Sequence, residues 1–354
     1  MKLSILDARR PDERAEWVRL WESSAERDVF AHPTYAEQFA GEGDDVLCAV
    51  GLWDDGGVLF PLLLRPIDRL PWASGAPSRD ATTPYGYGGP TRLREPAVEQ
   101  EAAFFSELES QLRAKQVVAA FSRLSLFPGL AAIPPNWKVT EVAPNVVCSL
   151  HRPPEEQWRE YAHKVRKNVN RARQHGLRCE IDLEGRRLDD FLAVYESTMA
   201  RRGASDSYLF PRTFFEKLLT IPSACVYFHV LAGDRVVSTE LVLRSRRHLY
   251  SFLGGTLSDA FELRANDLLK HEVIGWGHAE GLEAFVLGGG FTPGDGIFQY
   301  KKAFAPDGVV PFRTASLVLL PSECASLVER RTAWAAERGE SWSPRETYFP
   351  PYRS

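Results

Sequence analysis

The sequence predicts an α/β (α+β) protein built from two similar domains in tandem. The chain has 354 residues, more than the roughly 100 to 200 residues of an ordinary domain. Hydrophobic residues make up 44% and charged residues 25%, a composition typical of folded globular proteins. The two halves also show the same order of expected strands and helices. We expect one domain over residues 1–152, a second over 153–320, and a C-terminal helix with a proline-rich tail over 321–354.

The first half starts this order with a predicted β-hairpin. Two apolar segments, 46–53 and 57–64, flank the Asp-Asp-Gly turn at 54–56, and an Asp-Gly pair between apolar runs is typical of a tight turn. After a loop rich in proline and glycine, residues 98–115 have the periodicity of an amphipathic helix, and the apolar segment 117–127 follows as a strand. The order is strand, strand, loop, helix, strand.

The second half repeats that order with one more strand. The predicted segments are strands over 224–231, 235–244 and 248–255, a helix over about 262–280, and a strand over 284–288. An antiparallel meander followed by a helix and a strand is the core pattern of the acyltransferase fold called GNAT. We therefore expect two tandem GNAT-like domains, with the boundary at Pro153 and Pro154.

Composition excludes several classes of protein. The net charge of −4 gives no general attraction to polyanions, so a phosphate site needs a local basic patch. The five cysteines are scattered, which predicts reduced thiols, and the histidines show no metal-ligand spacing, so no metal site is expected. No apolar run is long enough to cross a bilayer, and the charged start does not resemble a signal peptide. A cytoplasmic location is expected, with peripheral contact to a membrane-bound substrate left open.

A basic amphipathic helix is the strongest local signal. Between residues 155 and 176, apolar residues recur every three or four positions, and cations occupy the remaining surface. One interpretation is a solvated helix face; the other is a site for tRNA phosphates or for a diphosphate. The cations are Lys164, Arg166, Lys167, Arg171 and Arg173.

A second group of cations lies at the predicted end of the next helix. Arg201 and Arg202 precede Gly203, and Tyr208 and Phe210 follow shortly after. A guanidinium group binds phosphate or carboxylate with two parallel hydrogen bonds. The pair therefore predicts an anionic substrate site, although paired arginines are also common at helix ends that bind nothing.

A glycine-rich segment carries the third signal. Five glycines between residues 288 and 296 follow a predicted strand, and Lys301 and Lys302 lie in the apolar stretch 297–304, which we interpret as a strand. A lysine buried there needs an anionic partner or a developing oxyanion to neutralise. One of the two lysines is expected to act in the site, and the other to face solvent.

A tyrosine-containing loop in the first half is a weaker candidate. Residues 80–90 combine Tyr85 and Tyr87 with glycines that permit unusual backbone angles. The loop either lines a substrate site or is a packed turn.

These segments, taken together, resemble the FemABX family of non-ribosomal peptidyl transferases. The motifs, in order, are KVRKNVNRARQHGL, the F-x-x-x-Y-x-x-T-M-x-R-R-G pattern from Phe191, YSFLGGT, the segment from Leu263 to Gly290, and GIFQYKKAF, with a looser YGGPT tract in the first half. The resemblance covers roughly residues 30–320. It implies two GNAT-like domains and transfer of an amino acid from aminoacyl-tRNA to an amine, typically on a peptidoglycan precursor.

The resemblance also implies roles for individual residues. Lys301 corresponds to the family's lysine after an aromatic residue, with Tyr300 in place of phenylalanine, and Tyr250 corresponds to a strand tyrosine. Arg202 or Arg201, with Tyr208, would lie near the acceptor. We expect Lys301 to stabilise the oxyanion and Tyr250 to orient the substrate, and we name Asp295 as the nearest carboxylate for a general base.

The donor, the acceptor and even catalysis stay open at this point. Aminoacyl-tRNA is the expected co-substrate, and no bound cofactor is expected. An acyl-CoA donor, used on a cell-surface sugar or a small amine, is the alternative, although the usual GNAT pyrophosphate motif is missing. The expected acceptor is an amine such as a UDP-linked muropeptide or a lipid-linked precursor. A third possibility, from another class, is a GNAT-fold binding module without catalysis.

Overall fold

A computed structural model describes residues 1–94, 97–203, 209–292 and 294–354. The chain forms two compact units. Unit 1 comprises Met1–Val142 and Phe312–Ser354, and unit 2 comprises Ala143–Pro311. Each unit is a sheet with helices, so the α/β fold class and the repeated order of elements are confirmed.

Unit 1 is built on a mixed sheet. Its strand order is β1-β2-β3-β4-β6-β13, with the short β5 paired to β3. All of these pairs are antiparallel except β4 with β6, which is parallel. The strands are β1 (Lys2–Asp7), β2 (Asp45–Trp53), β3 (Gly56–Pro66), β4 (Arg79–Thr82), β5 (Thr91–Arg92), β6 (Val117–Arg123) and β13 (Val309–Val318).

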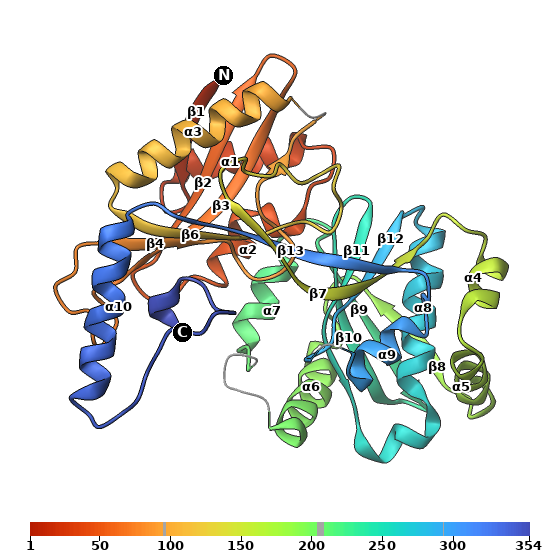
Figure 1. Cartoon of the computed structure of the whole chain (residues 1–354). Coiled ribbons are helices and arrows are strands. Elements are labelled where there is room, and N and C mark those ends of the chain that lie inside the picture. Colours follow the sequence, from red (N-terminus) through yellow and green to blue (C-terminus); the bar gives the residue numbers. More distant parts are fainter. Residues whose placement is uncertain (95–96, 204–208, 293) are drawn as a thin grey trace. The chain divides into compact units, whose positions relative to one another are not determined.

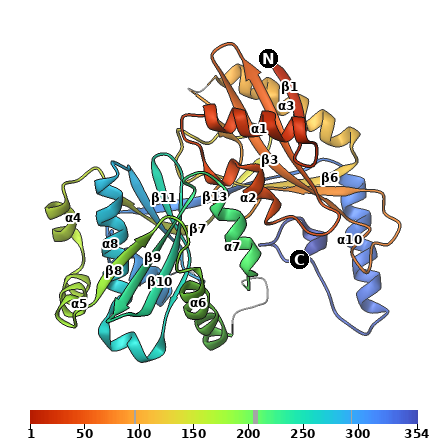
Figure 2. The same ribbon diagram turned by 180° about the vertical axis from the view of Figure 1, so that it is seen from behind.

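Helices cover both faces of the sheet of unit 1. Figure 1 shows α3 over one face, and Figure 2, the view from behind, shows α1 and α2 on the other. Helix α3 buries Phe104, Phe105, Leu108 and Leu112 against residues of β2, β3 and β6. The helical segments are α1 (Pro11–Ser23), η1 (Val29–Ala31), α2 (Pro33–Glu37), α3 (Val98–Ala114), α10 (Pro321–Ala336) and η4 (Pro351–Arg353).

Unit 2 repeats this architecture. Its strand order is β7-β12-β11-β10-β9-β8, and β11 with β12 is again the parallel pair. The predicted meander and its following strand are confirmed. The strands are β7 (Lys138–Ser149), β8 (Arg178–Asp182), β9 (Cys225–Ala232), β10 (Arg235–Arg244), β11 (His248–Thr256) and β12 (Ala284–Gly288).

The main core of unit 2 lies between the sheet and helices α5 and α8. Val165 and Val169 of α5 and Leu269 and Val273 of α8 pack with Phe228 of the sheet, and all five are almost fully buried. Phe191 of α6 packs onto Tyr227, and Phe215 of α7 packs onto Phe191. Tyr227 neighbours Phe228 in β9 and therefore points to the opposite face of the sheet. The helical segments are α4 (Pro154–Glu160), α5 (His163–Gln174), α6 (Leu188–Arg202), α7 (Arg212–Leu219), η3 (Ser258–Leu263), α8 (Ala265–Ala279) and α9 (Gly296–Lys302).

Two strands are exchanged between the repeats. Strand β7 follows β6 of unit 1 in the chain, but Val146–Ser149 pair antiparallel with β12 in unit 2. Strand β13 follows β12 of unit 2, but Thr314–Val318 pair antiparallel with β6 in unit 1. Each unit is therefore completed by a strand that the other repeat supplies.

The compact units divide the chain differently from the predicted ranges. The chain first passes from unit 1 to unit 2 after Val142, rather than at Pro153, because the end of β7 joins the sheet of unit 2. The segment 321–354 is part of unit 1. Its helix α10 and Tyr352 pack with Trp72, and Tyr352 is fully buried.

Two local expectations were wrong. The basic segment forms two helices, α4 and α5, because Tyr161 and Ala162 adopt extended backbone angles between them. The stretch around Lys301, interpreted as an apolar strand, forms helix α9 instead. The Asp295 side chain caps this helix by accepting a hydrogen bond from the Phe298 N–H.

The anchoring of the C-terminal tail leads to a prediction about stability. Asp80 is fully buried and accepts hydrogen bonds from Arg65 Nε, at 2.6 Å, and from Arg353 Nε. We expect Asp80→Ala to destabilise unit 1 by about 3–5 kcal/mol, because it leaves two largely buried guanidinium groups without their charge partner. Denaturant unfolding followed by tryptophan fluorescence measures the change. Asp68→Ala, at an exposed aspartate of the same unit, is the control and should change stability by less than about 0.5 kcal/mol; equal effects of the two variants would contradict the prediction.

Candidate active site

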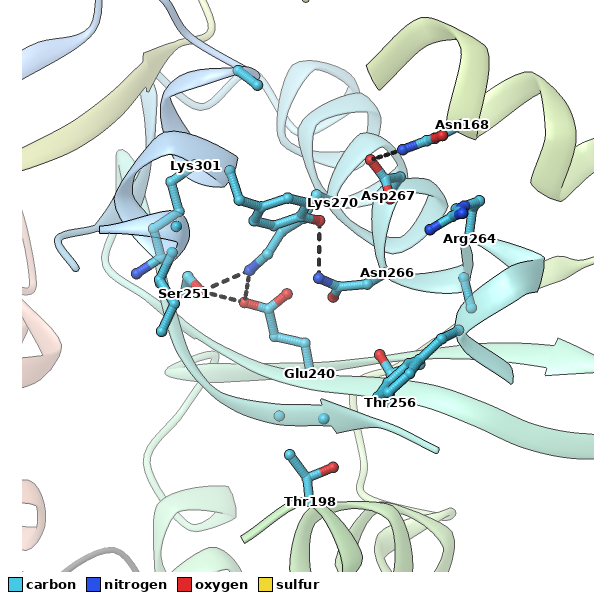
Figure 3. A pocket seen from close by; sticks show the side chains of 18 of the residues that line it. Asn168, Thr198, Glu240, Ser251, Thr256, Arg264, Asn266, Asp267, Lys270 and Lys301 are labelled. Carbon is cyan, nitrogen blue, oxygen red and sulfur yellow. Dashed lines mark hydrogen bonds and ion pairs between the residues drawn. The ribbon is translucent and has the colours of Figure 1, made fainter. Parts of the chain in front are cut away.

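A pocket of about 1310 Å³ opens in unit 2, and every residue that lines it belongs to this unit. Strands β10 and β11 form one side of it, and the beginning of α8 and helix α9 lie opposite, as Figure 3 shows. Residues of α5, of η3 and of the C-terminal turns of α6 also line it. The pocket thus lies where the central strands of this sheet meet the helices that follow them.

Strand β11 carries a β-bulge in the wall of this pocket. Leu241 pairs with Leu253, but its neighbour Val242 pairs with Ser251, so Phe252 is an extra residue in β11. A bulge of this kind bends the strand and redirects the side chains beside it. It therefore affects where Ser251 points.

An ion pair is buried at the base of the pocket. Lys270 Nζ of α8 lies 2.5 Å from Glu240 Oε1 of β10 and donates a hydrogen bond to Ser251 Oγ of β11 at 2.8 Å. Ser251 Oγ in turn donates to Glu240 Oε1 at 2.5 Å. Lys270 and Glu240 are only 6% and 4% exposed, and Figure 3 shows the three side chains converging. Each charge offsets the desolvation of the other.

The sequence analysis missed this pair. Its signal was weak but present, because Glu240 interrupts the apolar run of β10 and Lys270 lies on the apolar side of α8. A buried charge in each of two neighbouring elements predicts an ion pair between them.

Lys301 reaches the pocket from α9. Its Nζ donates a hydrogen bond to the backbone carbonyl of Gly289 at 2.6 Å, so the predicted lysine and the predicted glycine-rich segment do meet. Burial lowers the pKa of Lys301 to about 8; the charge of Lys270 lowers it further, while Glu240 and Asp295 act in the opposite direction. Lys302, the next residue, does not line the pocket.

Asp295 lines the pocket, but its carboxylate is hydrogen-bonded to backbone N–H groups. Its carboxylate accepts hydrogen bonds from the N–H groups of Phe291, Thr292 and Phe298 at 2.7, 3.0 and 2.8 Å. These bonds, that of Phe298 first, hold the pKa of Asp295 below its usual value. Asp295 therefore caps helix α9, and its role as general base stays a prediction.

A second polar cluster lies at the beginning of α8. Asn266 donates to the Tyr300 hydroxyl at 2.9 Å, and Asn168 of α5 donates to Asp267 Oδ1 at 3.2 Å (Figure 3). Burial raises the pKa of Asp267, and the bond from Asn168 partly opposes it. Tyr300 lines the pocket as expected, with its hydroxyl directed to α8.

The rim of the pocket is basic. Arg201 and Arg202, both exposed in the last turn of α6, line it together with Lys164 and Arg264. Arg201 also donates to the Thr256 carbonyl at 3.1 Å and stacks over the Phe261 ring at 4.8 Å. Tyr208, predicted beside this arginine pair, lies outside the described residues.

Three of the five cations of α5 are engaged by other groups of the protein. Arg166 donates to the backbone carbonyls of Arg159 and Tyr161, Arg171 lies 3.5 Å from Glu262, and Arg173 lies 3.3 Å from Glu272. Lys164 and Lys167 have no ion-pair partner in the described part of the chain. The acids that engage Arg171 and Arg173 come from η3 and α8, so the sequence of α5 alone did not reveal them.

Three other predicted residues are not part of the pocket lining. Ser251 faces α8, so its neighbour Tyr250 points to the opposite face of the sheet and is buried there. Tyr85 and Tyr87 belong to unit 1, where Tyr85 lies under the Arg123 guanidinium and Tyr87 contacts Phe312. The pocket thus lacks the orienting tyrosine expected at position 250.

The described residues contain no group of acids, histidines and cysteines that could hold a metal ion. None of the helices in those residues is both long enough and apolar enough to span a membrane.

Comparisons with known proteins agree with this architecture. Residues 159–302, which contain every residue of the pocket lining except Ala303, match the family model described as "Acetyltransferase (GNAT) domain". No curated protein matches the sequence significantly. The fold and the family model together define a GNAT-fold acyltransferase domain.

Solved structures share this fold over most of the chain. The crystal structure of FemX is similar over 91% of this chain and 98% of its own, with a TM-score of 0.67 and 12% identity. A conserved protein of unknown function from Bacteroides thetaiotaomicron has a TM-score of 0.55 and 11% identity over 86% of this chain and 97% of its own. The C-terminal domain of a protein named as a lysylphosphatidylglycerol synthetase, from Agrobacterium fabrum, has a TM-score of 0.53 and 12% identity over 89% and 97%. The protein thus has a FemX-like, GNAT-type fold, and the resemblance seen in the sequence is confirmed at the level of the fold.

The environment of Lys301 predicts an unusual titration. NMR of ¹³Cε-labelled lysine, with Lys301→Arg to assign the signal, should show Lys301 titrating near pH 8. Its pKa in the folded protein lies below that of the unfolded chain, so the folded protein holds fewer protons between about pH 8 and 10.5. The contribution of Lys301 to stability is therefore least favourable below pH 8 and improves as the pH rises to 10.5. A Lys301 signal that titrates above pH 10 would show that the side chain is solvated.

Proposed function

We propose that the protein is an N-acyltransferase that transfers an acyl group from an activated ester to an amine in the pocket of unit 2. The observation that carries this proposal is Lys301, a cation with a lowered pKa beside the buried Lys270–Glu240 pair. The GNAT family match and the FemX-like fold support the class of reaction.

Positioning and charge stabilisation are sufficient for this chemistry, because the ester is already reactive. The acceptor nitrogen attacks the ester carbonyl carbon, and the carbonyl oxygen becomes an oxyanion. The Lys301 ammonium group, held by the Gly289 carbonyl, stabilises that oxyanion. With a pKa of about 8, Lys301 is mostly protonated at neutral pH and gives its proton readily to the departing oxygen.

We propose aminoacyl-tRNA as the donor. The cations at the rim, the exposed Lys164, Arg201 and Arg202 and the half-buried Arg264, support a donor that carries phosphate groups outside the reacting centre. The acceptor is proposed to be an amine such as a UDP-linked muropeptide or a lipid-linked precursor. Acyl-CoA also carries phosphates, so the same rim keeps it as the alternative donor.

A screen with the full chain tests the class of reaction and the donor. Purified protein is incubated with bulk tRNA charged with labelled amino acids, or with labelled acetyl-CoA, and with UDP-linked muropeptide or n-butylamine as acceptor. Label in the amide product from tRNA supports the proposal, and label only from acetyl-CoA supports the alternative donor. Transfer from neither donor would overturn the proposed function and favour a binding module.

Lys301 should be required for catalysis in this assay. We expect Lys301→Ala to lower kcat about 10² to 10³-fold while the protein stays folded, because one stabiliser of the oxyanion is lost. Lys302→Ala is the matched control, since Lys302 has the same charge one residue along and does not line the pocket. Similar losses in both variants would show that Lys301 has no specific role.

The two lysines of α5, Lys164 at the rim and Lys167 beside it in the helix, should contribute to how tRNA binding depends on salt. The logarithm of affinity, measured by filter binding, should fall linearly with the logarithm of salt concentration, by about 0.7 to 0.9 per phosphate contact. Replacing Lys164 and Lys167 together by alanine should flatten the slope by about one to two units, because neither is ion-paired in the described structure. Arg173→Ala, which removes a cation engaged by Glu272, should change the slope less. A slope that the double variant leaves unchanged would exclude α5 from the tRNA interface.

A further inference from the structure

One carboxylate oxygen in the pocket has no hydrogen-bond donor. Glu240 Oε1 accepts from both Lys270 and Ser251, while Glu240 Oε2 is buried and has no partner among the described residues. Burying a carboxylate oxygen without a donor is unfavourable, because the oxygen loses its hydrogen bonds to water. Such an oxygen in a functional pocket therefore suggests that a ligand supplies the missing donor.

The direction of this oxygen agrees with a donor that comes from a ligand in the pocket. Figure 3 shows Glu240 Oε2 turned away from Lys270 and Ser251, on the side of the pocket where Asn266 lies. The Asn266 amide donates one of its two hydrogens to the Tyr300 hydroxyl and makes no hydrogen bond to Glu240 among the described residues. Lys270 and Ser251 hold the carboxylate by its other oxygen, which fixes its orientation.

Glu240 is also coupled to the cation that faces the reaction. Two carboxylates act on the charge of Lys301, those of Glu240 and Asp295. Both carboxylate oxygens of Asp295 accept hydrogen bonds from backbone N–H groups, whereas Glu240 has one oxygen without a hydrogen-bond donor among the described residues. The other acids of the lining are Asp267, held by Asn168, and Glu262, which is exposed and lies 3.3 Å from Arg264.

We propose that Glu240 is the group that accepts the proton of the attacking amine, and that Lys270 and Ser251 are positioning residues that aim its free oxygen at the amine. This proposal rests on the acyl transfer proposed above. It also defines the acceptor as a nitrogen that bears a proton to give up and that enters on the Asn266 side of Glu240.

The proton transfers then balance. The C–N bond forms as the amine attacks, and the positively charged nitrogen of the tetrahedral intermediate gives its proton to Glu240 Oε2. The C–O bond of the ester breaks, and Lys301 protonates the departing oxygen. Protonated Glu240 returns its proton to neutral Lys301, which restores both groups and leaves an amide and an alcohol as products.

The test compares two variants in the transfer assay, with the donor and acceptor that react in the screen. Glu240→Gln should lower kcat about 10² to 10⁴-fold, as expected for a lost general base, and remove the rising limb of the kcat/KM pH profile. Because Glu240→Gln leaves Lys270 buried without its partner, the double variant Glu240→Gln/Lys270→Met provides a neutral pair of similar size. Circular dichroism and thermal melting establish whether it is folded.

The outcomes separate a catalytic role from a structural one. If Glu240 accepts the proton, the double variant is folded but as inactive as Glu240→Gln. Lys270→Met alone, which keeps the carboxylate, should retain more activity and move the rising limb to higher pH, because removing a neighbouring cation favours the protonated acid. Glu280→Gln, at a surface carboxylate paired with Arg244 outside the pocket, should behave like wild type.

Two results would overturn the proposal, and they are distinct from failure of the function itself. A folded double variant with activity within about threefold of wild type would show that the pair is only structural. A pH profile unchanged in Glu240→Gln would exclude this residue as the proton acceptor. Absence of transfer by the wild-type protein from either donor would instead remove the proposed function on which this inference rests.

Discussion

The pairing of Lys270 with Glu240 determines how the pocket of unit 2 is arranged. A lysine on the packed side of α8 and a glutamate in a central strand would each be strongly unfavourable if buried alone. Together, and with Ser251, they satisfy one another and connect α8 to both β10 and β11. The two charges of this pair act on Lys301 in opposite directions: Lys270 adds to the lowering of its pKa by burial, and Glu240 opposes it.

Helix α9 shows how a short element presents a reactive group. Asp295 binds the N–H groups of the preceding loop and of the helix, so loop and helix form one rigid turn. The loop approaches so closely that a Cβ at Gly290 would lie 2.3 Å from Asp295 Oδ1, which explains a glycine there. Lys301 lies near the end of α9, and its ammonium group donates a hydrogen bond back to this loop, at the Gly289 carbonyl.

Much of the fold could be predicted because its signals are local. The Asp-Gly turn at 54–56 and the apolar periodicity of 98–115 each depend on neighbouring residues, and the structure has strands and a helix there. The site was harder, because its contacts join distant residues. Glu240 and Lys270 are brought together only by the packing of α8, and the face on which Tyr250 lies depends on the strand's place in the sheet. The helix at Lys301 had a local signal, an aspartate three residues before Phe298, that the apolar composition concealed.

Because β7 and β13 are exchanged, each repeat needs a strand that is covalently attached to the other repeat. If the chain were divided between β7 and β13 and the two parts were separated, each part would lack the strand that closes its own sheet, and the edges of β6 and β12 would be exposed. Open edges of this kind promote pairing with other chains. Recombination that replaced one repeat as a module would therefore disturb the other, so the two halves of this chain are expected to be inherited together even though each follows the same structural plan.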